Sequence, residues 1–171
     1  MHINFEFKAR TQDHEAIKNV LLQQNARFAG EDNQTDIYFN VATGRLKLRQ
    51  GNIENALIYY ERENTNEPKQ SNVMLYQHPA DDTLLAILKK VHGVKCVVKK
   101  KRRIYFIDNV KFHLDEVEQL GTFVEVEAID ETGSLGLQKI TGQCLHYVAL
   151  LKILPEDYVQ LSYSDMILQL F

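Results

Sequence analysis

The sequence has little cysteine and no long apolar run. Its two cysteines, Cys96 and Cys144, lie far apart in apolar surroundings, which is typical of reduced core thiols in a cytoplasmic protein. Neither forms the paired-ligand spacing of a structural zinc site with His92 or His146. No stretch approaches the length of a membrane span, and Met1-His2-Ile3-Asn4 is unlike the start of a secretory signal. We therefore expect a cytoplasmic protein with no membrane partner.

Excess positive charge and several familiar catalytic motifs are also missing. The formal net charge is -3, which argues against a general nucleic-acid binder. There is no glycine-rich phosphate loop of the Walker type and no nucleophile elbow. The basic residues are nevertheless clustered: Lys99 to Arg103 are consecutive, and Arg45, Lys47 and Arg49 alternate. The length of 171 residues predicts a single domain, 1–171, with a sizeable core.

Short alternating segments separated by turn residues predict a chain built mostly of β-strands. We expect strands over Ile3–Arg10, Asp36–Asn40, Arg45–Gln50, Ala56–Glu63, Ser71–His78, Cys96–Ile107, Val110–Val117 and Thr122–Ile129. Apolar residues at helical spacing predict helices after Asp13 and over Asp81–Val91, Leu137–Leu154 and Ser164–Leu170. Gly30 to Asn33 reads as a turn, and Asn64 to Lys69, with Pro68, as a mobile loop. Consecutive strands with few crossover helices favour an α+β fold with an antiparallel sheet or barrel.

The strands carry their charges on one face. Glu6, Lys8 and Arg10 share one face of the first strand, because side chains two residues apart point the same way. The same rule gives one charged face made of Glu6, Lys8, Arg10, Arg45, Lys47, Arg49, Lys100, Arg102, Lys111, His113, Asp115, Glu125 and Glu127, with Tyr60 and Arg62 sharing a face in the strand between. An open sheet with this face in water is the simplest interpretation. Lys99, Lys101 and Arg103 fall on the outer face.

These side chains suit a metal ion and a phosphate group. The carboxylates Glu6, Asp115, Glu125 and Glu127 are hard oxygen donors of the kind that Mg²⁺ and Mn²⁺ prefer. Salt bridges to Lys8 or Arg102 are the alternative, and spacing alone favours them. Inward-facing arginines and lysines suit phosphate oxygens. His113 fits a polar lining or core residue better than a catalytic base, and Tyr38, Tyr60 and Tyr105 fit packing roles.

Several segments together resemble the CYTH superfamily, the triphosphate tunnel metalloenzymes. Asn4-Phe5-Glu6-Phe7-Lys8 is similar to the family's N-terminal Glu-x-Glu-x-Lys signature. The similarity continues in order through Gln34–Phe39, Gly44–Arg49, Leu57–Arg62, Pro68–Ser71, Lys100-x-Arg102 before Ile104-Tyr105, His113–Glu127 and Ser162–Ile167. The segment His113–Glu127 matches best, and the class IV adenylyl cyclases are the most similar branch.

The resemblance implies a closed or nearly closed antiparallel eight-stranded β tunnel with helices packed outside. It implies Mg²⁺ or Mn²⁺ as cofactor and a small-molecule triphosphate as substrate, with no nucleic-acid partner. Members convert ATP to cyclic AMP and pyrophosphate, or hydrolyse thiamine triphosphate or inorganic tripolyphosphate. The implied phosphate-binding residues are Lys8, Arg10, Lys47, Arg49, Arg62, Lys100, Arg102 and Lys111, of which Lys8, Arg62, Lys100 and Arg102 are the implied catalytic residues. The implied metal ligands are Glu6, Asp115, Glu125 and Glu127.

One position departs from the family pattern. The first glutamate of the signature is Asn4, whose amide oxygen can bind a metal but brings no negative charge. We expect a metal-dependent enzyme most similar to a class IV adenylyl cyclase, acting as a monomer or homodimer. A phosphohydrolase is the alternative reaction. A non-catalytic triphosphate- or nucleotide-binding protein is the alternative of another class, and Asn4 is the feature that supports it.

Overall fold

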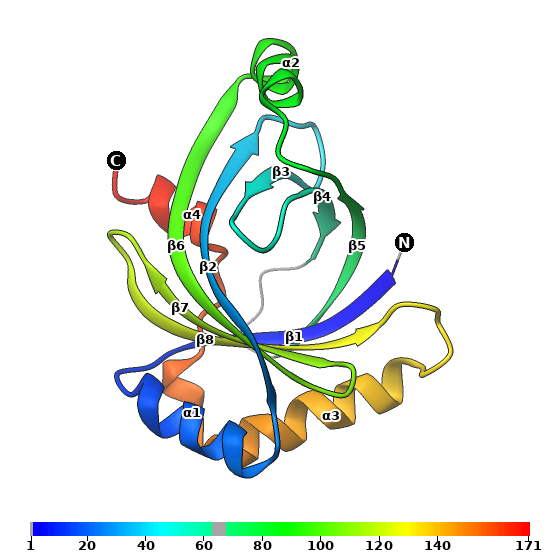
Figure 1. Ribbon diagram of the computed structural model, residues 1–171, viewed down its shortest axis with the longest axis vertical. Helices are drawn as coiled ribbons and strands as arrows, with labels where there is room; N and C mark the ends of the chain where they lie inside the picture. The colour runs from blue at the N-terminus through cyan, green and yellow to red at the C-terminus, as the bar shows by residue number, and fades with distance from the viewer. Residues whose placement is uncertain (1, 63–67) are drawn as a thin grey trace.

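Eight antiparallel strands close into a barrel in the order β1-β5-β4-β3-β2-β6-β7-β8 (Figure 1). The computed structural model describes residues 2–62 and 68–171. The strands are β1 (His2–Arg10), β2 (Arg27–Phe39), β3 (Arg45–Gln50), β4 (Ala56–Glu61), β5 (Lys69–Gln77), β6 (Val94–Ile107), β7 (Val110–Val117) and β8 (Gly121–Asp130). The barrel confirms the tunnel fold and excludes the open sheet.

The described residues form four α-helices outside the barrel, as expected: α1 (His14–Gln23), α2 (Asp82–His92), α3 (Leu137–Leu150) and α4 (Tyr163–Leu168). A 3₁₀ turn over Pro155–Asp157 precedes α4. Asp13 caps α1 by accepting a hydrogen bond from the Ala16 amide, and Asp81 caps α2 in the same way. Figure 1 shows α1 and α3 under β1, β7 and β8, with α2 at the opposite end of the molecule. No helix of the described residues is long and apolar enough to cross a membrane.

The helices cover the apolar outer face of β1, β7 and β8. Phe7, Phe112, Val124 and Val126 are buried there in one cluster with residues of α1 and α3, including Ile17. Since side chains alternate along a strand, burying this face outside the barrel turns the charged residues between them inward. The same alternation on β6 leaves Lys99 and Lys101 exposed, as predicted.

Three predicted boundaries are wrong. Gly30 to Asn33 does not form a turn but belongs to the long strand β2. The pairing of β2 with β6 shifts register between Phe28 and Gly30, where Gly30 takes a positive φ of 136°. Helix α3 ends at Leu150 rather than Leu154, because Lys152 takes a positive φ of 54°. Of the predicted loop, residues 64–67 lie outside the described residues, and Lys69 begins β5.

Candidate functional site

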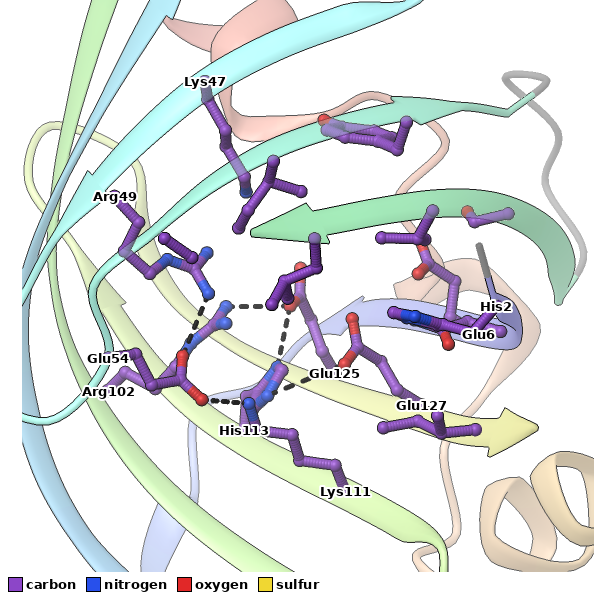
Figure 2. A pocket seen from close by; sticks show the side chains of 18 of the residues that line it. His2, Glu6, Lys47, Arg49, Glu54, Arg102, Lys111, His113, Glu125 and Glu127 are labelled. Carbon is purple, nitrogen blue, oxygen red and sulfur yellow. Dashed lines mark hydrogen bonds and ion pairs between the residues drawn. The ribbon is translucent and has the colours of Figure 1, made fainter. Parts of the chain in front are cut away.

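The barrel encloses one large polar cavity of about 910 Å³, to which all eight strands contribute side chains. Its ionisable lining consists mainly of alternating bases and acids: Glu6, Lys8, Lys47, Arg49, Glu54, Arg62, Lys100, Arg102, Lys111, His113, Glu125 and Glu127. Figure 2 shows several of them, among them Arg49, Glu54, Arg102 and Glu125, pointing into the cavity. A cavity lined by both basic and acidic side chains suits a ligand that combines an anion with a cation. The anion is a partner for the bases and the cation a partner for the acids, and charged groups are costly to bury without partners.

The structure brings together all but two of the site residues predicted from the sequence. Arg10 is exposed, and its Nη1 donates to the Leu120 carbonyl oxygen at 2.9 Å, with the guanidinium stacked over the Phe123 ring. Asp115 is fully buried in the wall behind the cavity lining. Arg10 therefore lies outside the cavity, and Asp115 faces another side chain instead of the cavity.

Asp115 orients Arg102. Its two carboxylate oxygens accept from Arg102 Nε at 2.7 Å and Nη2 at 2.6 Å, and the Tyr163 hydroxyl donates to it at 2.8 Å. Arg102 Nη2 also donates to Glu125 Oε2 at 2.8 Å. Burial opposes charging Arg102, but Asp115 and Glu125 outweigh it and raise the pKa of the guanidinium further. Arg102 is thus a permanently charged, rigidly held donor on the cavity wall.

A second buried carboxylate, Asp36, gathers three cations from two strands. It accepts from Arg49 Nε at 2.8 Å and Nη2 at 2.9 Å, from Lys47 Nζ at 3.1 Å and from Lys100 Nζ at 2.7 Å. Burial tends to raise the Asp36 pKa, but the three cations hold it well below its usual value. Burial also lowers the pKa of Lys100 to about 7, against the attraction of Asp36. The Lys100 ammonium therefore gives up its proton near neutral pH unless an anion arrives.

We expect anion binding to take up a proton at Lys100. A bound anion favours the charged amine, so affinity should fall as the pH rises above about 7, by up to about tenfold per pH unit for one proton. Sulfate is the suitable probe because it stays doubly charged over this range. Isothermal titration between pH 6.5 and 8 measures the slope, and Lys100→Met should bind more weakly with a flatter profile. An equal slope in both proteins would contradict this assignment.

Lys8 and Arg62 are two further bases of the cavity lining. Lys8 Nζ is 3.5 Å from Glu125 Oε1, donates to the Leu161 carbonyl oxygen and lies 4.1 Å from the centre of the Tyr163 ring. Burial lowers the Lys8 pKa to about 8. Arg62 forms an ion pair with Glu6. The C-terminal segment before α4 thus helps to place Lys8.

The carboxylates of β1 and β8 form an acidic corner that fits a divalent cation. Glu6 and Glu127 are direct partners in the β1–β8 ladder, and the Glu127 pKa is raised to about 7 by burial and by the charge of Glu6. Ligand atoms of His113, Glu125 and Glu127 lie within 4.8 Å of one another. Asn4 Oδ1 and His113 Nε2 are buried, and neither has a hydrogen-bond partner among the described residues. Carboxylates, an amide oxygen and one imidazole match the donors that Mg²⁺ or Mn²⁺ accepts.

Sequence reasoning did not single out three residues of this site. Asp36 and Tyr163 hold the bases in place, and Glu54 enters the cavity from the β3–β4 turn. His113, predicted as a polar lining or core residue, lines the cavity and joins the acidic corner. Asp36 lies two residues from Tyr38 in β2 and therefore on the same face of the strand, and this spacing could have predicted its orientation. The sequence of the turn around Glu54 contains no pattern that predicts that this side chain enters the cavity.

Comparisons with known proteins agree with this geometry. The model of the CYTH domain matches residues 2–160. The PH1012 protein of Pyrococcus horikoshii OT3 is similar over 96% of this chain and 98% of its own, with 25% identity and a TM-score of 0.81. A candidate adenylate cyclase of Vibrio parahaemolyticus shares the fold at 18% identity (TM-score 0.78; 96% and 97% covered).

A Hippeastrum protein, described as a candidate adenylyl cyclase with a dominant triphosphatase activity, also shares the fold at 14% identity (TM-score 0.63; 98% and 94% covered). No curated protein matches the sequence. The family model spans all eight strands of the barrel, and the chain therefore belongs to the CYTH domain family.

Proposed function

We propose that this protein is a metal-dependent enzyme that acts on an organic triphosphate inside the barrel, converting ATP to cyclic AMP and pyrophosphate. The observation that carries the proposal is one cavity inside the barrel that is lined both by a set of bases and by the acidic corner. Lys8, Lys100 and Arg102 line the same cavity as Glu6 and Glu127. A triphosphate needs both, because its phosphate oxygens attract the bases while it carries a divalent cation to the acids.

The basic residues are assigned to hold the triphosphate chain. Lys47, Lys100 and Arg49 are held by Asp36, and Arg102 by Asp115, so little reorganisation is needed when phosphate arrives. In cyclisation the ribose 3′-oxygen bonds to the α-phosphorus and loses its proton to water, while the bond from that phosphorus to the bridging oxygen breaks and pyrophosphate leaves. The bases neutralise the charge that gathers on pyrophosphate. A bound divalent cation would add further charge stabilisation at the phosphate oxygens.

The apolar part of the cavity lining supports an organic group on the substrate. Ile53, Leu75, Phe106 and Ile129 line the cavity alongside the charged residues. Apolar side chains of this kind favour contact with a ring rather than with a fourth phosphate. Thiamine triphosphate meets this requirement as well as ATP, so hydrolysis by water attack on the terminal phosphorus is the second function to test.

The test is to incubate the protein with ATP, thiamine triphosphate and tripolyphosphate, each with Mg²⁺ or Mn²⁺, and to quantify all products. We expect cyclic AMP and pyrophosphate from ATP. Orthophosphate with ADP or with thiamine diphosphate would assign a hydrolase instead. No product from any triphosphate, with binding retained, would identify a non-catalytic binding protein.

Anion binding should stabilise the fold. The cavity bases repel one another when no ligand neutralises them, and a ligand that binds only the folded state stabilises it by mass action. Tripolyphosphate at about 100 times its dissociation constant should raise the melting temperature by about 5 to 10 °C. Thermal denaturation with and without millimolar tripolyphosphate or sulfate measures the shift. An unchanged melting temperature would count against a phosphate-binding cavity.

Asn4→Glu tests the departure from the family signature. Asn4 lines the cavity and its Oδ1 is buried without a partner among the described residues, so a carboxylate there adds charge to the acidic corner. We expect the variant to need less Mg²⁺ or Mn²⁺ for half-maximal activity with the best substrate. A metal titration of both proteins decides the matter, and an identical curve or a higher requirement would be the contrary result. Activity in Asn4→Glu alone would show that the natural protein only binds.

A further inference from the structure

The turn between β3 and β4 places a fixed carboxylate in the basic part of the cavity. Glu54 Oε2 accepts from Arg49 Nη1 and from Gln34 Nε2, each at 3.0 Å, and its Oε1 pairs with Lys111 Nζ. Figure 2 shows Glu54 pointing into the pocket, between β3 and β7. Two of the bases expected to bind phosphate therefore already hold an anion that belongs to the protein.

Hydrogen bonds and close packing against Asp32 hold the turn in one conformation, so the position of Glu54 in the cavity is fixed. Asp32 is fully buried in β2 and accepts from the amides of Ile53 and Glu54, each at 2.9 Å. A Cβ at Gly51 would lie 2.5 Å from Asp32 Oδ1, so the turn packs against Asp32 only with glycine at this position. Asn55 closes the turn by donating to the Gly51 carbonyl oxygen at 2.9 Å.

Glu54 differs from Asp36 in where it lies. The Asp36 side chain is 1% exposed and is not part of the cavity surface, so it supports the bases from behind. The Glu54 side chain is 24% exposed and lines the cavity itself. Burial opposes its charge, but Lys111 and Arg49 together lower the Glu54 pKa far below its usual value, so it stays ionised. A phosphate oxygen that approaches Arg49 Nη1 or Lys111 Nζ is repelled by the charged Glu54 carboxylate, because Glu54 lies on the cavity surface whereas Asp36 lies behind the bases.

We propose that Glu54 is a specificity-determining residue that limits the length of the phosphate chain the cavity accepts, by occupying the donors of Arg49 and Lys111. This inference rests on the proposed function, since it requires a triphosphate in the cavity. On this proposal, a chain with one more phosphate extends toward Arg49 Nη1 and Lys111 Nζ and there meets Glu54. Neutralising Glu54 releases both donors, while Asp36 still holds Arg49 through Nε and Nη2.

The experiment compares binding of pyrophosphate, tripolyphosphate and tetrapolyphosphate by isothermal titration, without divalent cations so that no turnover occurs. In Glu54→Gln, tetrapolyphosphate should gain roughly tenfold in affinity relative to tripolyphosphate, because two charged donors become available. Glu116→Gln removes the same charge from an exposed position on β7 and should leave the ratio unchanged.

An unchanged tetra- to tripolyphosphate ratio in Glu54→Gln would overturn the inference, and so would an equal gain for all three ligands, which indicates a general charge effect. If Glu54→Gln does not fold, Glu54→Asp carries the test. Its shorter carboxylate withdraws from the donors and should shift the ratio in the same direction by a smaller factor, and an unchanged ratio again overturns the inference. Wild-type protein that binds none of the three ligands would instead reject the proposed function.

Discussion

Replacing Arg102 by Met should be the most destabilising single change in the cavity. The substitution leaves the Asp115 carboxylate fully buried with only the Tyr163 hydroxyl among its described hydrogen-bond partners, and it removes one partner of Glu125. Losing one member of a buried ion pair costs about 3 to 5 kcal/mol. Urea denaturation at pH 7 measures this loss, and product formation from any accepted triphosphate should fall by about a hundredfold or more.

Arg103→Met is the matched control on the next position of β6. Arg103 points outward and pairs with Glu15, whose side chain is 64% exposed, and surface pairs contribute about 0 to 1 kcal/mol. The control should therefore remain near wild-type stability and activity. Equal stability of Arg102→Met and Arg103→Met would show that Asp115 does not depend on Arg102.

The sequence predicted the strands because the period of two is strong throughout them. Phe5 and Phe7 alternate with Glu6 and Lys8, and such alternation states which residues share a face. It cannot state which face points inward, since a solvated charged face and a lined cavity give the same pattern. The resemblance to a tunnel family supplied that choice, and burial of the apolar face under α1 and α3 explains it physically.

Alternation does not predict how far along each strand the cavity extends, or which residues distant in the sequence contact one another. Arg10 shares a face with Lys8, yet it lies at the end of β1 beside Leu120, beyond the cavity. Asp115 shares a face with His113, yet Arg102 stands between it and the cavity. Glu54 shows the converse, because a turn residue enters the cavity through contacts with Asp32, 22 positions earlier in the chain. Such partners depend on barrel closure, which local patterns do not encode.

Glu127→Gln should abolish metal-dependent activity without weakening the metal-free fold. Glu127 lies beside Glu6, and burial with this like charge raises its pKa to about 7, so its ionised form destabilises the metal-free protein. Glutamine keeps the shape and removes the repulsion, but it also removes a carboxylate from the proposed metal ligands. Activity with Mg²⁺ or Mn²⁺ should fall by about a hundredfold or more.

The pH dependence gives this prediction a second readout. The folded pKa of Glu127, about 7, lies above its ordinary value of 4.5, so the folded state binds more protons between these values than the unfolded state. Its contribution to stability is therefore present at low pH and is lost as the pH rises from about 4.5 through 7. In urea denaturation with a chelator, Glu127→Gln should gain stability relative to wild type between pH 5 and pH 7.5.

Glu125→Gln is the matched control, two positions earlier on the same strand. Glu125 is paired with Arg102, His113 and Lys8, and although burial tends to raise its pKa, these partners hold it well below its usual value. Removing its charge takes the carboxylate from Lys8 and leaves Arg102 with Asp115 alone among the described residues, so this variant should lose stability at pH 7.5 where Glu127→Gln does not. Two findings would contradict the assignment of Glu127: a loss of stability equal to that of Glu125→Gln, or wild-type activity across a Mn²⁺ titration.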